Sequence, residues 1–319
     1  MGCSNTATTE INIKQEEKEL TSFNVDPNNP VFIEKRKILC ILTTSDGKIL
    51  MGTRDGKIIV YKTWKCDEKY ELNIFGNSVQ AIIELPNKYL AGCSNDKTVK
   101  IFNIKNDQAE IIKTFECLGQ VWAMINYING GIIYGDIIGE FKHIEYKNRN
   151  YEIEYSSLVH QKNILNLIYL YDKVIGIVYL GEGLVFYDLE QEDELGTLEI
   201  CYPCPPNLSV LKISDHELLL GGELKVNVVD YKERKLVNLI DIRTCYCFYQ
   251  LSKNILLINE GEGNLRTYQI SRDNKGDLIF DLKDEKVIHD SVIIGIARLA
   301  NHRFLTFDID HDYRLWQAQ

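Results

Sequence analysis

The sequence has 319 residues, of which 45% are hydrophobic and 26% charged, with only 6 prolines, so it describes a folded soluble chain and excludes a collagen-like or largely disordered one. Lys and Arg number 36 against 46 Asp and Glu, which gives a formal net charge of −10. Because no strong basic cluster is present, nucleic acid is not expected as a partner.

The N-terminus carries a lipidation pattern. Removal of Met1 would expose Gly2, and Thr6 four positions later completes the N-myristoylation motif. A single myristoyl chain binds membranes only reversibly. Residues 1–30 hold two lysines against five acids, so a basic patch cannot be the second signal, and S-palmitoylation of Cys3 is the remaining candidate.

This start resembles the dually acylated N-termini of Src-type kinases and G-protein α subunits, and the resemblance implies attachment to the cytosolic face of a membrane. The alternative is a chance Met-Gly-Cys start without lipid. No secretory signal precedes the first repeat, and the apolar stretches are too short to span a bilayer. The polar composition of residues 1–30 indicates a flexible tether, or else an ordinary frayed terminus.

A unit of about 42 residues recurs from residue 31 to residue 319. It is clearest where Ser78 to Leu85, Tyr89 to Ser94 and Thr98 to Asn103 read as three strands, separated by turns at Pro86-Asn87 and Asn95 to Lys97. Another short strand precedes the next apolar run. The pattern predicts four strands in each unit.

The segment Ala91 to Asn103 resembles the WD-repeat signature, with Phe102-Asn103 at the Trp-Asp positions. Equivalent anchor positions recur at intervals of 39 to 48 residues, and they are Tyr61, Phe102, Ile144, Tyr187, Val229, Tyr268 and Trp316. The resemblance implies an all-β fold, a seven-bladed β-propeller of four-stranded antiparallel blades over residues 31–319. Since the chain ends on a third strand, residues 31–34 are expected to supply the outer strand of the last blade and close the ring.

The last unit resembles the family most closely. His289, Thr306, Asp310 and Trp316 stand at the relative positions of the family's buried hydrogen-bond network. The resemblance implies that this network is structural, holding turn and strands together. The interval before Trp316 holds an insertion, Ser271 to Asp284, which is expected to be a solvated or partner-binding loop.

The nine cysteines are too few for a disulfide scaffold, and their odd number argues against complete pairing, so reduced cytosolic thiols are expected. Cys201 with Cys204 and Cys245 with Cys247 lie in equivalent parts of adjacent units and could in principle bind zinc. Because C-x-C is a poor structural-zinc half-site, free thiols are favoured, and neither metal nor any other cofactor is expected.

Enzyme signatures are absent: the sequence has no nucleophile elbow, P-loop, H-E-x-x-H or Rossmann fingerprint, and its six histidines are scattered. In a propeller, the turns between second and third strands and the outer-to-inner connections open on one face. Trp, Tyr and Arg dominate binding hot spots. The register therefore predicts a partner-binding rim that contains Arg54, Asn95, Trp122, Tyr202, Arg243 and Tyr246.

The leading interpretation is a non-catalytic protein-protein interaction scaffold, tethered to a cytosolic membrane face through N-terminal acylation. One alternative is a structural component of a cytoskeletal or ciliary assembly. A further alternative is a propeller enzyme acting at the central channel, which would need acid, base or metal groups on inner strands that are mostly Ile, Leu, Val and Tyr. Other proteins of unspecified identity are the expected partners.

Overall fold

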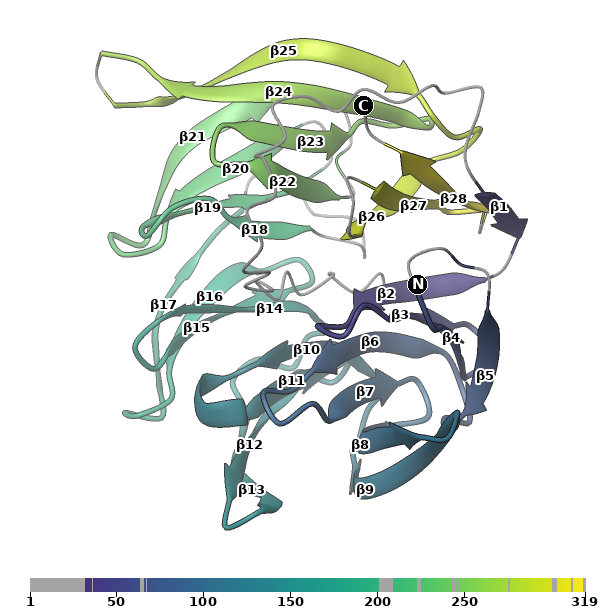
Figure 1. Cartoon of the computed structure of the whole chain (residues 1–319). Coiled ribbons are helices and arrows are strands. Elements are labelled where there is room, and N and C mark those ends of the chain that lie inside the picture. The colour runs from purple at the N-terminus through teal and green to yellow at the C-terminus, as the bar shows by residue number, and fades with distance from the viewer. Residues whose placement is uncertain are drawn as a thin grey trace. The chain divides into compact units, whose positions relative to one another are not determined.

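The computed structural model describes residues 32–35, 37–63, 66, 68–200, 209–222, 225–242, 245, 247–274, 276–299, 303–310 and 312–317. Within these residues the strands form seven four-stranded antiparallel sheets, each running from an inner to an outer strand (Figure 1). The fold is therefore an all-β, seven-bladed propeller, as the sequence pattern predicts. The chain divides into two compact units, one with four blades (Ile38–Glu199) and one with three.

The first unit contains blades 1 to 4. Blade 1 consists of β2 (Ile38–Thr43), β3 (Ile49–Thr53), β4 (Lys57–Tyr61) and β5 (Lys69–Asn73). Blade 2 consists of β6 (Val79–Glu84), β7 (Leu90–Ser94), β8 (Thr98–Lys105) and β9 (Gln108–Glu116). Blade 3 consists of β10 (Val121–Asn126), β11 (Ile132–Asp136), β12 (Glu140–Lys147) and β13 (Asn150–Leu158), with a short 3-10 turn, η1 (Ile128–Gly130). Blade 4 consists of β14 (Ile164–Tyr171), β15 (Val174–Tyr179), β16 (Gly183–Asp188) and β17 (Asp193–Leu198).

The second unit contains blades 5 to 7. Blade 5 consists of β18 (Val210–Lys212), β19 (Glu217–Leu220), β20 (Lys225–Asp230) and β21 (Lys235–Asp241). Blade 6 consists of β22 (Phe248–Ser252), β23 (Ile255–Asn259), β24 (Asn264–Arg272) and β25 (Leu278–Val287). Blade 7 consists of β26 (Ile293–Leu299), β27 (Arg303–Asp308), β28 (Asp312–Gln317) and the N-terminal strand β1 (Phe32–Lys35).

The outer strand of blade 7 comes from the other end of the chain. β1 pairs antiparallel with β28, and Phe32 lies opposite Leu315 while Lys35 lies opposite Asp312. The expected contribution of residues 31–34 is thus confirmed with a shift of one residue. In this way β28 gains a hydrogen-bonded neighbour along the edge it would otherwise leave unpaired.

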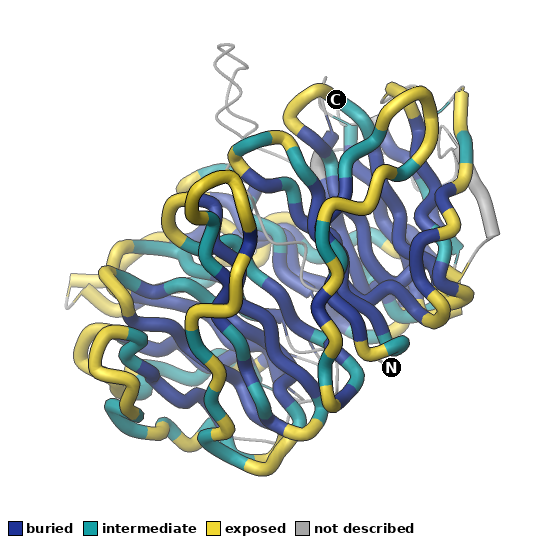
Figure 2. Tube along the Cα trace, turned by 90° about the horizontal axis from the view of Figure 1, so that it is seen from below, coloured by how far each residue is buried: buried dark blue, intermediate teal, exposed yellow. Residues whose placement is uncertain are grey.

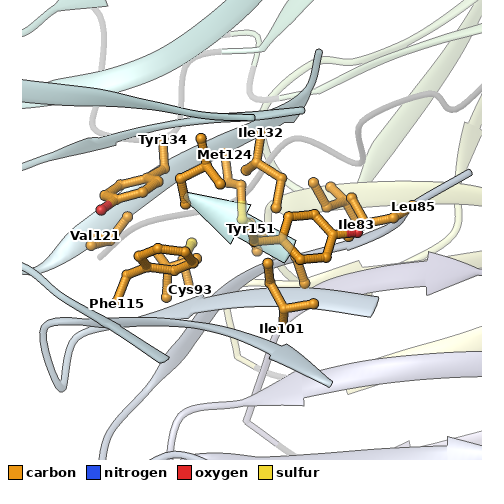
Figure 3. Close-up of a cluster of buried hydrophobic side chains, with 14 residues drawn as sticks. Ile83, Leu85, Cys93, Ile101, Phe115, Val121, Met124, Ile132, Tyr134 and Tyr151 are labelled. Carbon is orange, nitrogen blue, oxygen red and sulfur yellow. The ribbon is translucent and has the colours of Figure 1, made fainter. Parts of the chain in front are cut away.

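The seven anchor residues all lie on the third strand of their blade, and each is at most 7% exposed. Five of them belong to clusters that pack between neighbouring sheets of one unit, and these are Phe102, Ile144, Tyr187, Tyr268 and Trp316. Along the chain, buried strand interiors alternate with exposed turns (Figure 2). Between blades 2 and 3, Phe115, Ile101 and Cys93 face Tyr134 and Met124 (Figure 3). Each such buried side chain contributes about 1.5–3 kcal/mol relative to an exposed one.

The insertion before blade 7 differs from the expected loop. β24 and β25 extend as a long hairpin, in which Arg272 lies opposite Leu278 and only five residues separate the strands. Burial along β24 alternates on either side of the slip at Thr267 and Tyr268, which are both buried, so the period of two is that of a strand. Charge and turn formers concentrated near the tip made the sequence look like a loop.

Bulges recur at fixed places in the blades. In the inner strands β2, β6, β10, β14 and β26 the pairing slips after the first residue, which leaves one extra residue, and these are Leu39, Gln80, Trp122, Leu165 and Ile294. Among the described outer strands, β9, β13, β17, β21 and β25 each carry a slip beside the anchor, while β5 and β1 pair without one. A bulge re-aims the side chain it carries.

Candidate partner-binding surface

The expected rim residues fall partly within the described chain. Arg54 lies in the turn between β3 and β4, Asn95 in the turn between β7 and β8, and Trp122 on the inner strand β10. All three belong to the first unit. The other three expected residues, Tyr202, Arg243 and Tyr246, lie outside the described residues.

A chain of hydrogen bonds connects the turns of blades 1 and 2. The hydroxyl of Ser78 donates to the backbone oxygen of Arg54 at 2.9 Å, and the N–H of Asn95 donates to the backbone oxygen of Ser78 at 2.9 Å. The Arg54 side chain itself is exposed. Ser78 therefore links the backbone of the two turns, while the guanidinium of Arg54 stays in solvent.

The structure also brings Asn95 and Trp122 into direct contact. Trp122 Nε1 donates to Asn95 Oδ1 at 3.1 Å, and Gln80 Nε2 donates to the same oxygen at 3.0 Å. Gln80 and Trp122 are the bulge residues of adjacent inner strands, β6 and β10. The bulges thus direct both side chains toward one asparagine. We refer to Arg54, Ser78, Gln80, Asn95 and Trp122 as the rim cluster.

Two exposed apolar side chains lie next to the rim cluster. Leu118 is 69% exposed in the connection that leads into β10, and Ile138 is 40% exposed in the turn between β11 and β12. Ile137 N donates to Gln120 O at 3.0 Å, so the turn and the connection are held together. Because both side chains leave much of their apolar surface in solvent, their apolar character fits a binding role better than a folding role.

Asp136 fixes the backbone beneath these apolar residues. Its carboxylate accepts hydrogen bonds from the N–H groups of Gly119, Ile138 and Glu140, each at 3.0 Å. Burial raises the pKa of Asp136, although the three N–H donors favour its charged form. The geometry makes Asp136 a structural residue that presents Leu118 and Ile138 to solvent.

The turn of blade 2 departs from those of its neighbours at Lys97. The equivalent residue is Gly139 in blade 3, with φ 96°, and Lys97 takes a left-handed φ of 67°. A Cβ at Gly139 would collide with the backbone oxygen of His160, which explains the glycine. At Lys97 the left-handed conformation is retained with an exposed lysine, whose backbone oxygen accepts from Cys117 N at 2.8 Å.

Sequence reasoning missed Gln80, Leu118 and Ile138. The signal for Ile138 was present, because Ile137-Ile138 stands between Asp136 and Gly139 where a turn is normally polar. Gln80 was visible as the one polar residue near the start of an apolar run. Its bulge, and hence the direction of its side chain, depends on pairing with β7 and could not be read from the sequence.

In blade 7 the expected hydrogen-bond network is present, but a different aspartate takes part in it. Trp316 Nε1 donates to Thr306 Oγ1 at 2.7 Å, and His289 Nε2 lies 2.7 Å from the same oxygen. The carboxylate bonded to His289 Nδ1 is Asp308, at 3.0 Å, whereas Asp310 is exposed. The expectation for Asp310 is corrected: Asp308 ends β27 inside the blade, and two residues later the chain has already entered the turn.

Burial by itself would raise the pKa of Asp308, but hydrogen bonds from His289 and from the N–H groups of Asp312 and Asp310 lower it below its usual value. The side chains of His289 and Asp308 are 0% and 1% exposed. The His289–Asp308 pair, whose residue types could form a catalytic acid–base pair, is therefore buried inside the blade. There it links the connection before β26 to β27.

Two of the four candidate zinc ligands, Cys201 and Cys204, lie outside the described residues, as do Gly2 and Cys3 of the lipidation motif. Cys245 and Cys247 are buried, and their thiols lie 3.7 Å and 3.9 Å from the backbone oxygens of Cys247 and Ile293. In the part of the chain that the structure describes, no group of three or more His, Cys, Asp or Glu side chains is arranged to hold a metal, and no helix is long and apolar enough to cross a bilayer.

Comparison with known proteins agrees with the fold. The chain is similar to one in a solved structure entitled "Crystal Structure of Mitotic Checkpoint Complex", with a TM-score of 0.77 and 12% identity over 96% of this chain and 95% of that chain. No protein-family model and no curated protein matches the sequence. At this identity the likeness defines the class of protein, a seven-bladed β-propeller, by fold alone.

Proposed function

We propose that this propeller is a protein-protein interaction scaffold whose partner surface in the first unit is the rim cluster with Leu118 and Ile138. The observation that carries the proposal is that exposed Arg54 and partly exposed Trp122 are connected through the hydrogen bonds of Ser78 and Asn95, while exposed Leu118 lies in the connection that leads to Trp122. Arg and Trp are enriched at binding hot spots, and an apolar neighbour adds area that excludes water. The solved chain of similar fold is part of a complex, which supports the same class of role.

The proposal makes the chain a binding protein and not an enzyme. The groups gathered in the rim cluster are amides, an indole, a hydroxyl and a guanidinium, which recognise partners by hydrogen bonding and contact. The buried His289–Asp308 pair is engaged with Thr306 and Trp316. WD-repeat membership remains part of this proposal and rests on the resemblance at Phe102-Asn103.

The proposal also includes attachment of the scaffold to a membrane. Acylation of Gly2 and Cys3 would place the scaffold at the cytosolic face of a membrane, and its support is the N-terminal motif. Metabolic labelling with a myristate analogue tests it, with Gly2→Ala as the variant that cannot be labelled. Absent labelling of the parent chain and an unchanged distribution of Gly2→Ala on cell fractionation would remove this part.

Crosslinking followed by affinity purification tests the scaffold itself. The triple variant Arg54→Ala/Leu118→Ala/Trp122→Ala is expected to lose crosslinked proteins that the parent chain retains. A matched triple, Arg149→Ala/Ile128→Ala/Tyr169→Ala, removes similar side chains from other turns and strand ends of the same unit. If both triples retain the same proteins as the parent, the rim cluster is not the partner surface.

A further inference from the structure

The side-chain amide of Asn95 has an orientation that Trp122 dictates. An indole N–H can only donate a hydrogen bond, and Trp122 Nε1 lies 3.1 Å from the Asn95 amide. The atom facing the indole must therefore be the oxygen, Oδ1. It follows that Asn95 Nδ2, with two hydrogens, points elsewhere, and it has no hydrogen-bond partner among the described residues.

The orientation of the Gln80 side-chain amide follows in the same way from that of Asn95. The atom 3.0 Å from Asn95 Oδ1 has to be a donor, so it is Gln80 Nε2. Gln80 Oε1 then faces away from Asn95. This oxygen is buried without a hydrogen-bond partner in the described chain, and Gln80 as a whole is only 2% exposed. An unpaired buried acceptor costs stability, and a leucine at this position would avoid that cost.

The indole thus leaves two complementary groups unused on adjacent side chains: a donor on Asn95 and a buried acceptor on Gln80. An extended residue offers the matching pair, because its own N–H and C=O point to the same side of the chain, so the N–H can donate to Gln80 Oε1 and the oxygen can accept from Asn95 Nδ2. The partly exposed ring of Trp122 borders the pair and can cover an extended segment that docks there.

Two cations lie in the turns beside the pair. Arg54 and Lys97 are exposed, and neither side chain forms an ion pair within the described residues, although the protein carries a net charge of −10. The carboxylate next to Lys97 in the turn, Asp96, already accepts from the N–H groups of Gly76 and Thr98.

We propose that the rim cluster, with Lys97, binds an extended acidic peptide segment of a partner protein. One residue of the segment pairs through its own N–H with Gln80 Oε1 and through its own oxygen with Asn95 Nδ2, and an acidic side chain of the segment lies between Arg54 and Lys97. Because Oε1 is buried in the unliganded chain, a rotation of the Gln80 side chain accompanies docking. This inference deepens the proposed scaffold function and rests on it.

A phage-displayed library of random 12-residue peptides, selected on the full chain, is the probe. Enriched peptides are expected to share acidic residues. A synthetic peptide of the strongest enriched sequence is expected to bind Gln80→Leu and Trp122→Phe about tenfold more weakly than the parent, as the loss of one net hydrogen bond predicts. Gln108→Leu, at the exposed start of β9, is the matched control and should bind as the parent does.

A structural role for Gln80 would give a different result. If Gln80 served only packing, Gln80→Leu would lower the melting temperature and bind the peptide unchanged. The proposal expects a melting temperature that is unchanged or higher, together with weaker binding. With only three tryptophans in the chain, the indole Nε1–H resonance of Trp122 can be assigned by Trp122→Phe and should shift on titration with the peptide.

Three results would overturn the proposal: no peptide enriched above an unrelated control protein, enriched peptides that are basic, or equal binding by Gln80→Leu. The scaffold function fails separately. If Arg54→Ala/Leu118→Ala/Trp122→Ala loses crosslinked partners while Gln80→Leu binds peptide normally, the scaffold stands and the acidic-peptide inference falls. If the triple variant keeps all crosslinked partners, the proposed scaffold surface is wrong.

Discussion

His289 Nδ1 lies 3.0 Å from Asp308 Oδ2, and the two side chains are almost completely shielded from solvent. A carboxylate is an acceptor, so Nδ1 carries the hydrogen and the other ring nitrogen can accept from Thr306 Oγ1–H. The Thr306 oxygen in turn accepts from the indole of Trp316. The four side chains form a satisfied network in which every donor has an acceptor.

Replacing Asp308 with Asn should lower the free energy of unfolding by about 1–3 kcal/mol, because it weakens a buried hydrogen bond to the imidazole. The folded-state pKa of Asp308 is lowered, so its contribution is complete above the ordinary carboxyl pKa and is lost as pH falls through the folded value. Urea unfolding between pH 3 and 7 checks both points. Asp308→Asn should show a shallower acid dependence, and exposed Asp310→Asn should match the parent within about 0.5 kcal/mol.

Deletion of residues 2–35 should destabilise blade 7, because it removes β1 and leaves the edge of β28 unpaired. The expected signs are a lower melting temperature and faster aggregation by light scattering. Deletion of residues 2–29 keeps β1 and is the control. Equal melting temperatures for the two deletions would contradict a stabilising role for the β1–β28 pair.

Replacing Lys97 with Gly should raise the stability by about 0.5–1 kcal/mol. The left-handed conformation costs a residue with a side chain roughly 1–2 kcal/mol, and glycine avoids this cost. Part of the gain, roughly 0.5–1 kcal/mol, is lost again because glycine has more conformational entropy in the unfolded chain. Denaturant unfolding measures the difference, with Lys97→Ala as the control that keeps the strain. A destabilised Lys97→Gly would show that the lysine side chain supports the fold.

The hairpin of blade 6 is held to blade 5 by Arg272, whose guanidinium binds both carboxylate oxygens of Glu217, with Nη1 3.0 Å from Oε1. Burial would raise the pKa of Glu217, but hydrogen bonds from Arg272 and Ser214 lower it. Arg272→Leu removes the guanidinium from a buried carboxylate and leaves it with the Ser214 hydroxyl, which should cost about 1–3 kcal/mol, less than for a fully buried pair because Arg272 is 41% exposed. In thermal unfolding, the double variant Glu217→Leu/Arg272→Leu should be more stable than the single one.

The repeat was predictable because its signals are local. Apolar β-branched runs, an aromatic anchor such as Phe102 and turn residues such as Asn95 recur at an almost constant interval, and each blade reuses the same packing. The rim residues Asn95 and Trp122 followed from that register, and the structure joins them by a hydrogen bond.

The remaining features depend on pairing between strands. Asp308 and Asp310 are two residues apart, so both would point to the same face of a continuous strand. The resemblance alone could not show that the strand ends between them and that only Asp308 is buried in the blade. The extra residue in β6 that redirects Gln80 exists only relative to β7. Ser271 to Asp284 looked like a loop because its polar residues are those of the hairpin tip and of the exposed outer strand β25.

The slips in the outer strands β9, β13, β17, β21 and β25 have a consequence for how copies of this chain meet at high concentration. An incoming strand needs an even row of N–H and C=O groups, and a bulge beside the anchor breaks that row near its middle. Exposed isoleucines such as Ile111 and Ile112 on β9 would otherwise favour edge-to-edge stacking. The bulges thus make strand addition less favourable at five outer edges, whereas β5 and β1 pair without a slip.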